Sequence, residues 1–95
     1  MLDFFLKGHA RTDIAQIRKY TIKKWGKRQW ELYKKQVVKT LQNLANNPTI
    51  GIRIDEISPN SFRFPLKEHV IYYLLKDERI IFVGVLSASM SPKNL

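Results

Sequence analysis

The fold is decided by residues 25–51, which read WGKRQWELYKKQVVKTLQNLANNPTIG. Apolar side chains recur in this stretch at helical spacing: Trp30, Tyr33, Val37, Leu41 and Leu44. The spacing predicts a helix over about 27–46 that buries one stripe of its surface. Gly26 fits the left-handed residue that stops a preceding helix, and Pro48 cannot continue the helix that it follows.

The stretch before Gly26 predicts a partner helix that begins between Ala10 and Thr12 and ends near Lys24. Its apolar stripe is expected to carry Ile14, Ile17, Thr21 and Trp25. Because the corner at Gly26 is short, the two helices are expected to be antiparallel neighbours. A short apolar run at residues 3–6 predicts a first strand before them.

The chain after Pro48 predicts strands. Candidate strand segments lie at residues 50–57, 62–64, 69–75 and 79–86, with turns at 58–61 and 77–78. Pro65 is expected to end the second of these runs or to mark a bulge. One strand, a helical hairpin and an antiparallel meander indicate an α+β fold with the helices on one face. Residues 1–95 are expected to form a single domain, with 87–95 as a flexible tail.

Charge is distributed unevenly along the chain. Eleven of the 17 basic residues lie between residues 7 and 39, where only Asp13 and Glu31 are acidic, so this segment alone accounts for the formal charge of +9. The remaining six basic and six acidic residues cancel. Such a field attracts nucleic acid, an acidic protein or an anionic surface, although a merely solvated basic surface is an equally good interpretation.

The two long strand segments, 69–75 and 79–86, carry apolar residues on both faces. Helices cover only one face of the expected sheet, so the other face predicts contact with a protein partner. The alternative is that the C-terminal tail covers this face.

Several function classes are disfavoured by composition. The chain has no cysteine and only two histidines, His9 and His69, so no metal site is expected. It also has no Gly-rich phosphate-binding loop, so no cofactor is indicated. No segment reads as a signal peptide or as a membrane span of about 20 apolar residues, so we expect a cytoplasmic protein without membrane contact.

An ordered series of residues carries a family resemblance from about Gly8 to Met90. The series is Trp25-Gly26, Tyr33, Leu41, Leu44-Ala45, Asn47-Pro48, Gly51, Phe62-Arg63-Phe64 and His69-Val70-Ile71-Tyr72-Tyr73. It resembles the ParE branch of the RelE/ParE toxins of bacterial type II toxin–antitoxin systems. The resemblance implies a non-enzymatic toxin that inhibits DNA gyrase and blocks replication, without sequence-specific nucleic acid binding. It also implies neutralisation by an antitoxin whose acidic, partly disordered segment wraps the toxin in a hetero-oligomer.

Two alternatives stay open. RelE-like relatives are ribosome-dependent mRNA endonucleases, and Arg63 matches a basic strand residue of that branch. Many family members carry a histidine where this chain has Ser87, however, and no Tyr or His follows Tyr73. The missing proton donor disfavours RNA cleavage, so no catalytic residue is assigned. A nontoxic, degenerate family member is the other alternative.

Candidate binding residues follow from these considerations. The candidates for target binding are Lys23, Lys24, Lys27, Arg28, Arg63 and His69. The candidates for antitoxin binding are Tyr72, Tyr73, Arg18, Lys34 and Lys35. One of the two adjacent tyrosines should face away from the helices, because side chains alternate along a strand. The pairs Tyr20/Tyr33 and Trp25/Trp30 are expected to pack in the interior, with an exposed binding surface as the alternative for the tryptophans. His69 is expected to bond to backbone or solvent at its strand end.

Overall fold

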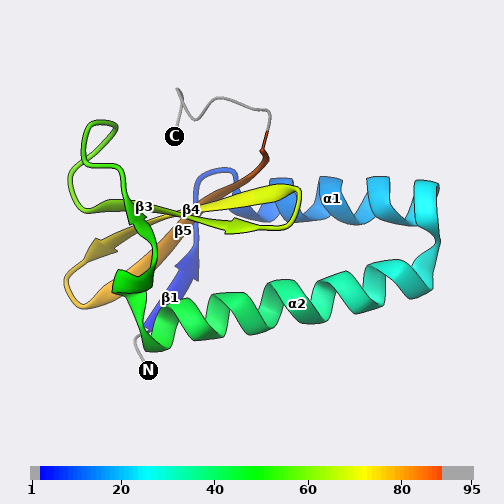
Figure 1. Ribbon diagram of the computed structural model, residues 1–95, viewed down its shortest axis with the longest axis horizontal. Coiled ribbons are helices and arrows are strands. Elements are labelled where there is room, and N and C mark those ends of the chain that lie inside the picture. Colours follow the sequence, from blue (N-terminus) through cyan, green and yellow to red (C-terminus); the bar gives the residue numbers. More distant parts are fainter. Residues whose placement is uncertain (1–2, 89–95) are drawn as a thin grey trace.

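The computed structural model describes residues 3–88, which form one layer of helices and one sheet (Figure 1). The elements in chain order are β1 (Asp3–Leu6), α1 (Ala10–Trp25), α2 (Lys27–Asn46), the 3-10 turn η1 (Pro48–Ile50), β2 (Ile52–Arg53), β3 (Ser61–Leu66), β4 (His69–Lys76) and β5 (Arg79–Ser87). The predicted α+β class and the bounds predicted for both helices are confirmed to within a residue or two.

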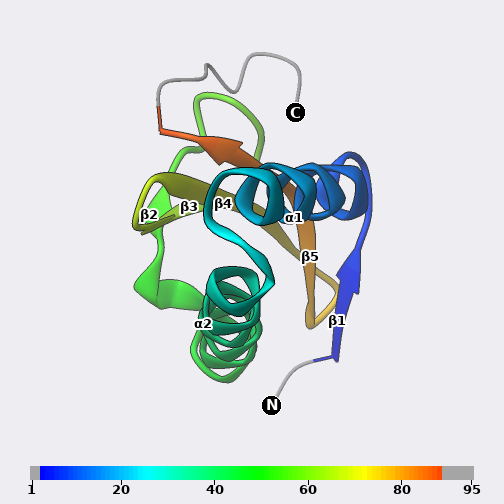
Figure 2. The ribbon, with the colours of Figure 1, turned by 90° about the vertical axis from the view of Figure 1, so that its right-hand side faces the viewer.

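The sheet has the strand order β1-β5-β4-β3-β2. β2 to β5 form the predicted antiparallel meander, whereas β1 adds in parallel to the outer side of β5, with Phe4 opposite Ile80. This parallel pair joins the two ends of the domain, and it lies at the edge opposite to β2 (Figure 2). Nothing in the sequence of β1 specified its neighbour.

One face of the sheet packs against α1 and α2 and contains the main core. The rings of Phe62 and Tyr73 stack with centroids 5.2 Å apart, and Phe82 lies beside Tyr73. The predicted stripe of α2, from Trp30 to Leu44, is buried against this face. The Tyr73 hydroxyl donates a hydrogen bond of 2.6 Å to the Pro48 carbonyl, which ties η1 to the sheet.

The helical hairpin, α1 with α2, extends past the strands, so that its corner lies away from the sheet (Figure 1). Gly26 forms this corner with a φ of 93°, a conformation that favours glycine, and its N–H donates to the Ile22 carbonyl. We call residues 23–28 the hairpin corner.

Two strand predictions need correction. Within residues 50–57 the strand is just Ile52–Arg53, followed by one bond from the Ile54 N–H to the Ser61 carbonyl, because η1 occupies the start of this segment and residues 55–60 form turns. Pro65 neither ends β3 nor marks a bulge: it lies opposite Val70 in regular register. Proline is tolerated there because β2 reaches only Phe62 and Arg63, which leaves the rest of β3 as an edge strand.

The face of the sheet that points away from the helices, here called the outer face, was predicted to be exposed. Val70 and Tyr72 lie on it, but Ile54 packs against both and all three side chains are buried. The prediction of an uncovered apolar face is therefore wrong for this part of the sheet.

The predicted flexible tail, 87–95, begins too early. Ser87 belongs to β5, and the Ala88 N–H donates to the Glu68 carbonyl at 2.8 Å. Residues 89–95 lie outside the described part of the chain.

Candidate functional site

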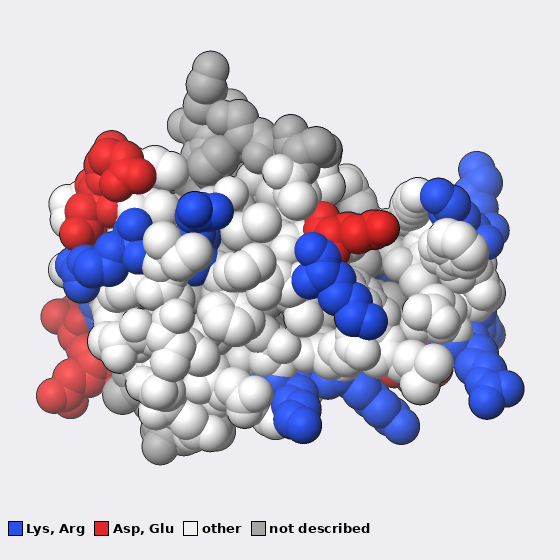
Figure 3. All heavy atoms as spheres, in the orientation of Figure 1, with Lys and Arg blue, Asp and Glu red and all other residues white. Residues whose placement is uncertain are grey.

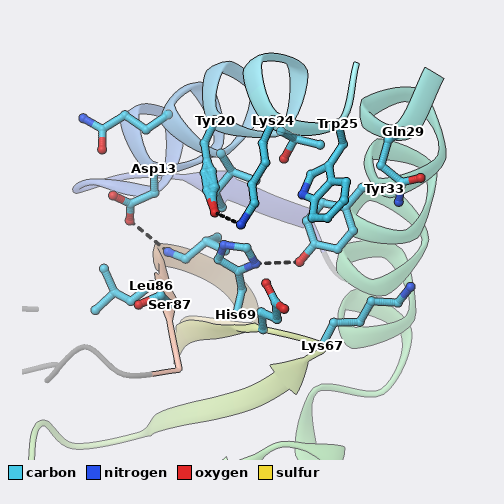
Figure 4. A pocket seen from close by; sticks show the side chains of 15 residues that line it. Asp13, Tyr20, Lys24, Trp25, Gln29, Tyr33, Lys67, His69, Leu86 and Ser87 are labelled. Carbon is cyan, nitrogen blue, oxygen red and sulfur yellow. Dashed lines mark hydrogen bonds between the residues drawn. The ribbon is translucent and has the colours of Figure 1, made fainter. Parts of the chain in front are cut away.

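A pocket of about 660 Å³ lies between the helical hairpin and the ends of β4 and β5 (Figure 4). α1 supplies one wall, Gln29 and Tyr33 of α2 supply another, and the β3–β4 turn with His69 and Ser87 forms the floor. We call it the hairpin pocket. It exists because the hairpin is longer than the strands beneath it.

The wall from α1 is a stripe with helical periodicity. Asp13, Ile17, Tyr20 and Lys24 recur three or four residues apart and therefore share one face of the helix. The Asp13 carboxylate accepts a hydrogen bond of 2.9 Å from the Val85 N–H, which docks α1 on β5. Sequence reasoning missed this stripe as a site, although the spacing was visible.

Lys24 and two aromatic rings form the mouth of the hairpin pocket. The Lys24 ammonium donates a hydrogen bond of 3.0 Å to the Tyr20 hydroxyl and lies 5.4 and 5.3 Å from the ring centroids of Tyr20 and Trp25. The hydrogen bond with Tyr20 is the main cause of a raised Lys24 pKa, so the amine is charged at neutral pH. Both rings are largely solvent-exposed, Tyr20 at 52% and Trp25 at 65%. The expectation that Tyr20 and Trp25 pack in the interior is thus wrong, whereas Tyr33 and Trp30 are buried.

Tyr33 and His69 form the inner end of the pocket. The Tyr33 hydroxyl lies 2.8 Å from His69 Nδ1 and 3.3 Å from the Leu66 carbonyl oxygen. Partial burial lowers the His69 pKa, against an opposing effect of the nearby Glu68 carboxylate, so the imidazole is mainly neutral at pH 7. The predicted backbone or solvent partner for His69 is therefore replaced by a side chain from α2.

The structure separates the predicted target-binding residues. Lys23, Lys24, Lys27 and Arg28 are all exposed around the hairpin corner, but only Lys24 lines the pocket. Arg63 lies opposite Tyr72 in the β3–β4 register, which places it on the outer face and away from His69. It is exposed and has no ion-pair partner among residues 3–88.

The predicted antitoxin-binding residues also divide. Arg18, Lys34 and Lys35 are exposed on the helices. Tyr72 and Tyr73 do alternate between the two faces, but Tyr72 is 5% exposed beneath Ile54 and Tyr73 is 0% exposed in the main core. Neither tyrosine offers surface to a partner, so the prediction that they contact an antitoxin is corrected.

The basic residues of the helices form an uncompensated surface. Lysine and arginine gather over the hairpin corner and along α2, whereas the opposite end carries both acidic and basic residues and a further acidic group lies in the middle of this face (Figure 3). Within residues 3–88 the one ion pair is between Arg53 and Asp55, far from the hairpin in the chain. The helical cations are therefore available to an acidic partner.

The described residues offer no other obvious chemistry. No group of three potential metal ligands occurs in residues 3–88, and no helix in that range is long and apolar enough to cross a membrane. The hairpin pocket is a concave site on which several polar groups converge.

Comparison with known proteins identifies the family. Residues 5–92 match the model of the "ParE toxin of type II toxin-antitoxin system, parDE". The toxins named ParE1 from two strains of Mycobacterium tuberculosis are each 29% identical over 80 residues, covering 84% of this chain and 82% of theirs. A solved structure described as "Chromosomal ParDE TA system from P. aeruginosa" superimposes with a TM-score of 0.77 over 92% of this chain and 96% of that one, at 13% identity, which shows a shared fold. The chain belongs to the ParE toxin family of type II toxin–antitoxin systems.

Proposed function

We propose that this ParE-family chain is a toxin that inhibits DNA gyrase by binding it, without catalysing a reaction, and so blocks replication in the cytoplasm. We further propose that a cognate antitoxin neutralises it in a hetero-oligomeric complex. The match to the ParE toxin model over residues 5–92 is the observation that carries this proposal. Binding requires no cofactor, metal ion or membrane.

The hairpin corner is the proposed target-binding surface. Lys23, Lys27 and Arg28 are exposed there, and Trp25 of the same corner adds a large exposed aromatic ring. Aromatic and arginine side chains are enriched at the energetic centres of protein interfaces. The corner also lies away from the sheet, where a large partner can approach it (Figure 1).

The remaining basic helical surface is the proposed antitoxin-binding region. Arg18, Lys34 and Lys35 face solvent on α1 and α2. An acidic, partly disordered antitoxin segment would be steered to this surface by charge, and its ordering cost would be offset by apolar burial. Competition between antitoxin and gyrase for the hairpin would explain neutralisation.

RNA cleavage is a second candidate because of one observation. Although the chain has no Tyr or His after Tyr73, the hairpin pocket brings Tyr20, Tyr33 and His69 together with Ser87. Groups that can transfer protons are therefore present despite their absence from the C-terminal sequence. Against cleavage, Arg63 lies on the opposite face of the sheet and cannot share a scissile phosphate with His69.

Two assays distinguish these functions. The purified chain is expected to inhibit DNA supercoiling by purified gyrase, and ribosome-bound mRNA is expected to stay intact in a purified translation system. Codon-specific mRNA cleavage that is lost on Tyr33→Phe or on Arg63→Ala, with gyrase unaffected, would establish the nuclease instead.

A further inference from the structure

We infer that the hairpin pocket binds one acidic side chain of the antitoxin segment, with its carboxylate between the Lys24 ammonium and His69 Nε2–H, and an adjacent apolar side chain of that segment against Trp25. This assignment rests on the proposed antitoxin partner and specifies the chemistry of the residues that enter the pocket.

The first donor is His69, in one of its two neutral tautomers. The Tyr33 hydroxyl has a single proton and two nearby acceptors, His69 Nδ1 at 2.8 Å and the Leu66 carbonyl at 3.3 Å. The hydroxyl can donate to either acceptor. When it donates to His69, Nδ1 holds the lone pair and Nε2 carries the ring proton, and a carboxylate beside Nε2 favours this tautomer. In Figure 4 the second ring nitrogen of His69 points away from Tyr33, toward the side of the pocket where Tyr20 and Lys24 lie. Tyr33 is thus a positioning residue, because its donation to Nδ1 leaves the neutral imidazole with an N–H donor facing the pocket.

The second donor is Lys24. The ammonium is held at the mouth by the Tyr20 hydroxyl and by two aromatic rings, so its position is restricted before any partner arrives. It has no carboxylate within ion-pair distance among residues 3–88. Glu68 is the nearby acidic group that acts on Lys24 and His69, but it forms no ion pair with either. A carboxylate has two acceptor oxygens and can therefore accept from both donors at once.

The space beside these donors suits an apolar side chain. Ile17, Leu86 and the exposed ring of Trp25 line the same pocket. A volume of about 660 Å³ exceeds what one carboxylate fills and lies in the range of sites that hold several ligand groups. The charged residues that line the pocket balance, Asp13 and Glu68 against Lys24 and Lys67, and the excess of cations lies around it on the helices. This surrounding field favours an acidic peptide, and an acidic residue next to a large apolar one satisfies both parts of the pocket.

A defined peptide tests the assignment. The probe is an acetylated 12-residue peptide in which Glu and Leu alternate, and the matched probe replaces every Glu by Gln. Each peptide is titrated calorimetrically into Lys24→Met and into Lys23→Met. The two variants lose the same charge at neighbouring positions, but only Lys24 lines the pocket. We expect Lys24→Met to weaken binding of the Glu peptide about tenfold, as loss of one charge-assisted hydrogen bond does, and Lys23→Met to weaken it less than about twofold.

Two substitutions at His69 separate its ring nitrogens. His69→Asn keeps an acceptor near the position of Nδ1 for Tyr33 but removes the outer donor, whereas His69→Gln places an amide N–H near the position of Nε2. We expect His69→Asn to lose about tenfold in affinity and His69→Gln to retain most of it. Nitrogen chemical shifts of the unmodified chain provide a measurement without mutation, since the Glu peptide should shift His69 Nε2 and leave His9 unchanged.

The assignment would be overturned if Lys23→Met and Lys24→Met weakened binding of the Glu peptide equally, or if the Gln peptide bound as tightly as the Glu peptide. It would also be overturned if a 12-nucleotide oligothymidylate displaced the bound peptide at a lower concentration than unlabelled Glu peptide does. Supercoiling assays on the same unmodified preparation report on gyrase inhibition separately. If the peptide tests fail while the chain still inhibits gyrase, the pocket assignment is wrong and the proposed gyrase target is unaffected.

Discussion

Tyr33 of α2 and His69 of β4 are joined side chain to side chain, with the tyrosine hydroxyl 2.8 Å from the imidazole Nδ1. The two residues are 36 positions apart in the chain, and their rings lie 5.7 Å apart. This contact fixes the second helix to the start of the central strand beside the hairpin pocket. It thereby links the packing of the core to the geometry of the proposed binding site.

Removing the Tyr33 hydroxyl is expected to destabilise the fold. Tyr33→Phe leaves His69 Nδ1 without its partner in a half-buried position, and we expect the free energy of unfolding to fall by about 1–2 kcal/mol. Urea unfolding followed by circular dichroism measures the change. Tyr20→Phe is the matched control, because it removes an exposed hydroxyl and should change stability by less than about 0.5 kcal/mol. Equal effects of the two substitutions would show that the Tyr33–His69 bond contributes nothing specific.

Stability should depend on pH through His69. Burial lowers the His69 pKa in the folded chain, so the unfolded state binds the proton more readily. The resulting stability is fully present above the unfolded-state pKa of about 6.5 and is lost as pH falls through the lower folded-state pKa. Urea midpoints measured between pH 7.5 and pH 5 should therefore decrease, and the decrease should be smaller in His69→Asn. A midpoint that rises on acidification would contradict this sign.

Gly51 is expected to be intolerant of a side chain. A Cβ atom at this position would overlap the Tyr73 hydroxyl, which is held in place by its hydrogen bond to the Pro48 carbonyl. We expect Gly51→Ala to cost about 1–3 kcal/mol, the usual range for overpacking. Gly26→Ala is the informative comparison, because nothing lies within 4 Å of its Cβ and only the strain of a φ of 93° is added. Thermal melting of both variants would test the difference, and a larger loss at Gly26 would oppose it.

Charge reversal at the hairpin corner should slow partner association without unfolding the domain. Lys23 and Lys27 are exposed and have no ion pair among the described residues, so Lys23→Glu with Lys27→Glu should change stability by no more than about 0.5 kcal/mol. The association rate with an acidic antitoxin should fall, and the effect should shrink at high salt. Lys76→Glu with Arg79→Glu changes the net charge equally at the opposite end of the sheet and serves as the control. Equal rates for the two double variants would favour a merely solvated hairpin.

Much of the fold could be predicted from the sequence because its signals are local. The helical hairpin was indicated by the apolar stripe from Trp30 to Leu44 and by the helix-stopping residues Gly26 and Pro48. The meander was indicated by the two continuous apolar strands. The parallel docking of β1 on β5 could not be predicted, since its four residues pair with a strand more than 70 positions away. The packing of Ile54 on the outer face could not be predicted for the same reason, because a contact between distant segments leaves no periodic pattern in either of them.

The site was only partly predictable. Charge patterning identified the lysines around Gly26. The stripe of Asp13, Tyr20 and Lys24 could also have been predicted, because these residues follow the same helical spacing that was used for the apolar residues of α1. Burial of Tyr72 and Tyr73 could not be read from alternation, which gives the face of a residue and not what covers it. The pairing of Tyr33 with His69 depends on the helical layer crossing the strand at one particular point.

Gyrase inhibition is tested most directly by measuring supercoiling of relaxed plasmid by purified gyrase as the purified chain is titrated. We predict dose-dependent loss of supercoiling, reversed by an acidic antitoxin and weakened by Lys23→Glu with Lys27→Glu, with ribosome-bound mRNA left intact. Full supercoiling at a large excess of folded chain, together with cleavage of ribosome-bound mRNA, would contradict the proposed function.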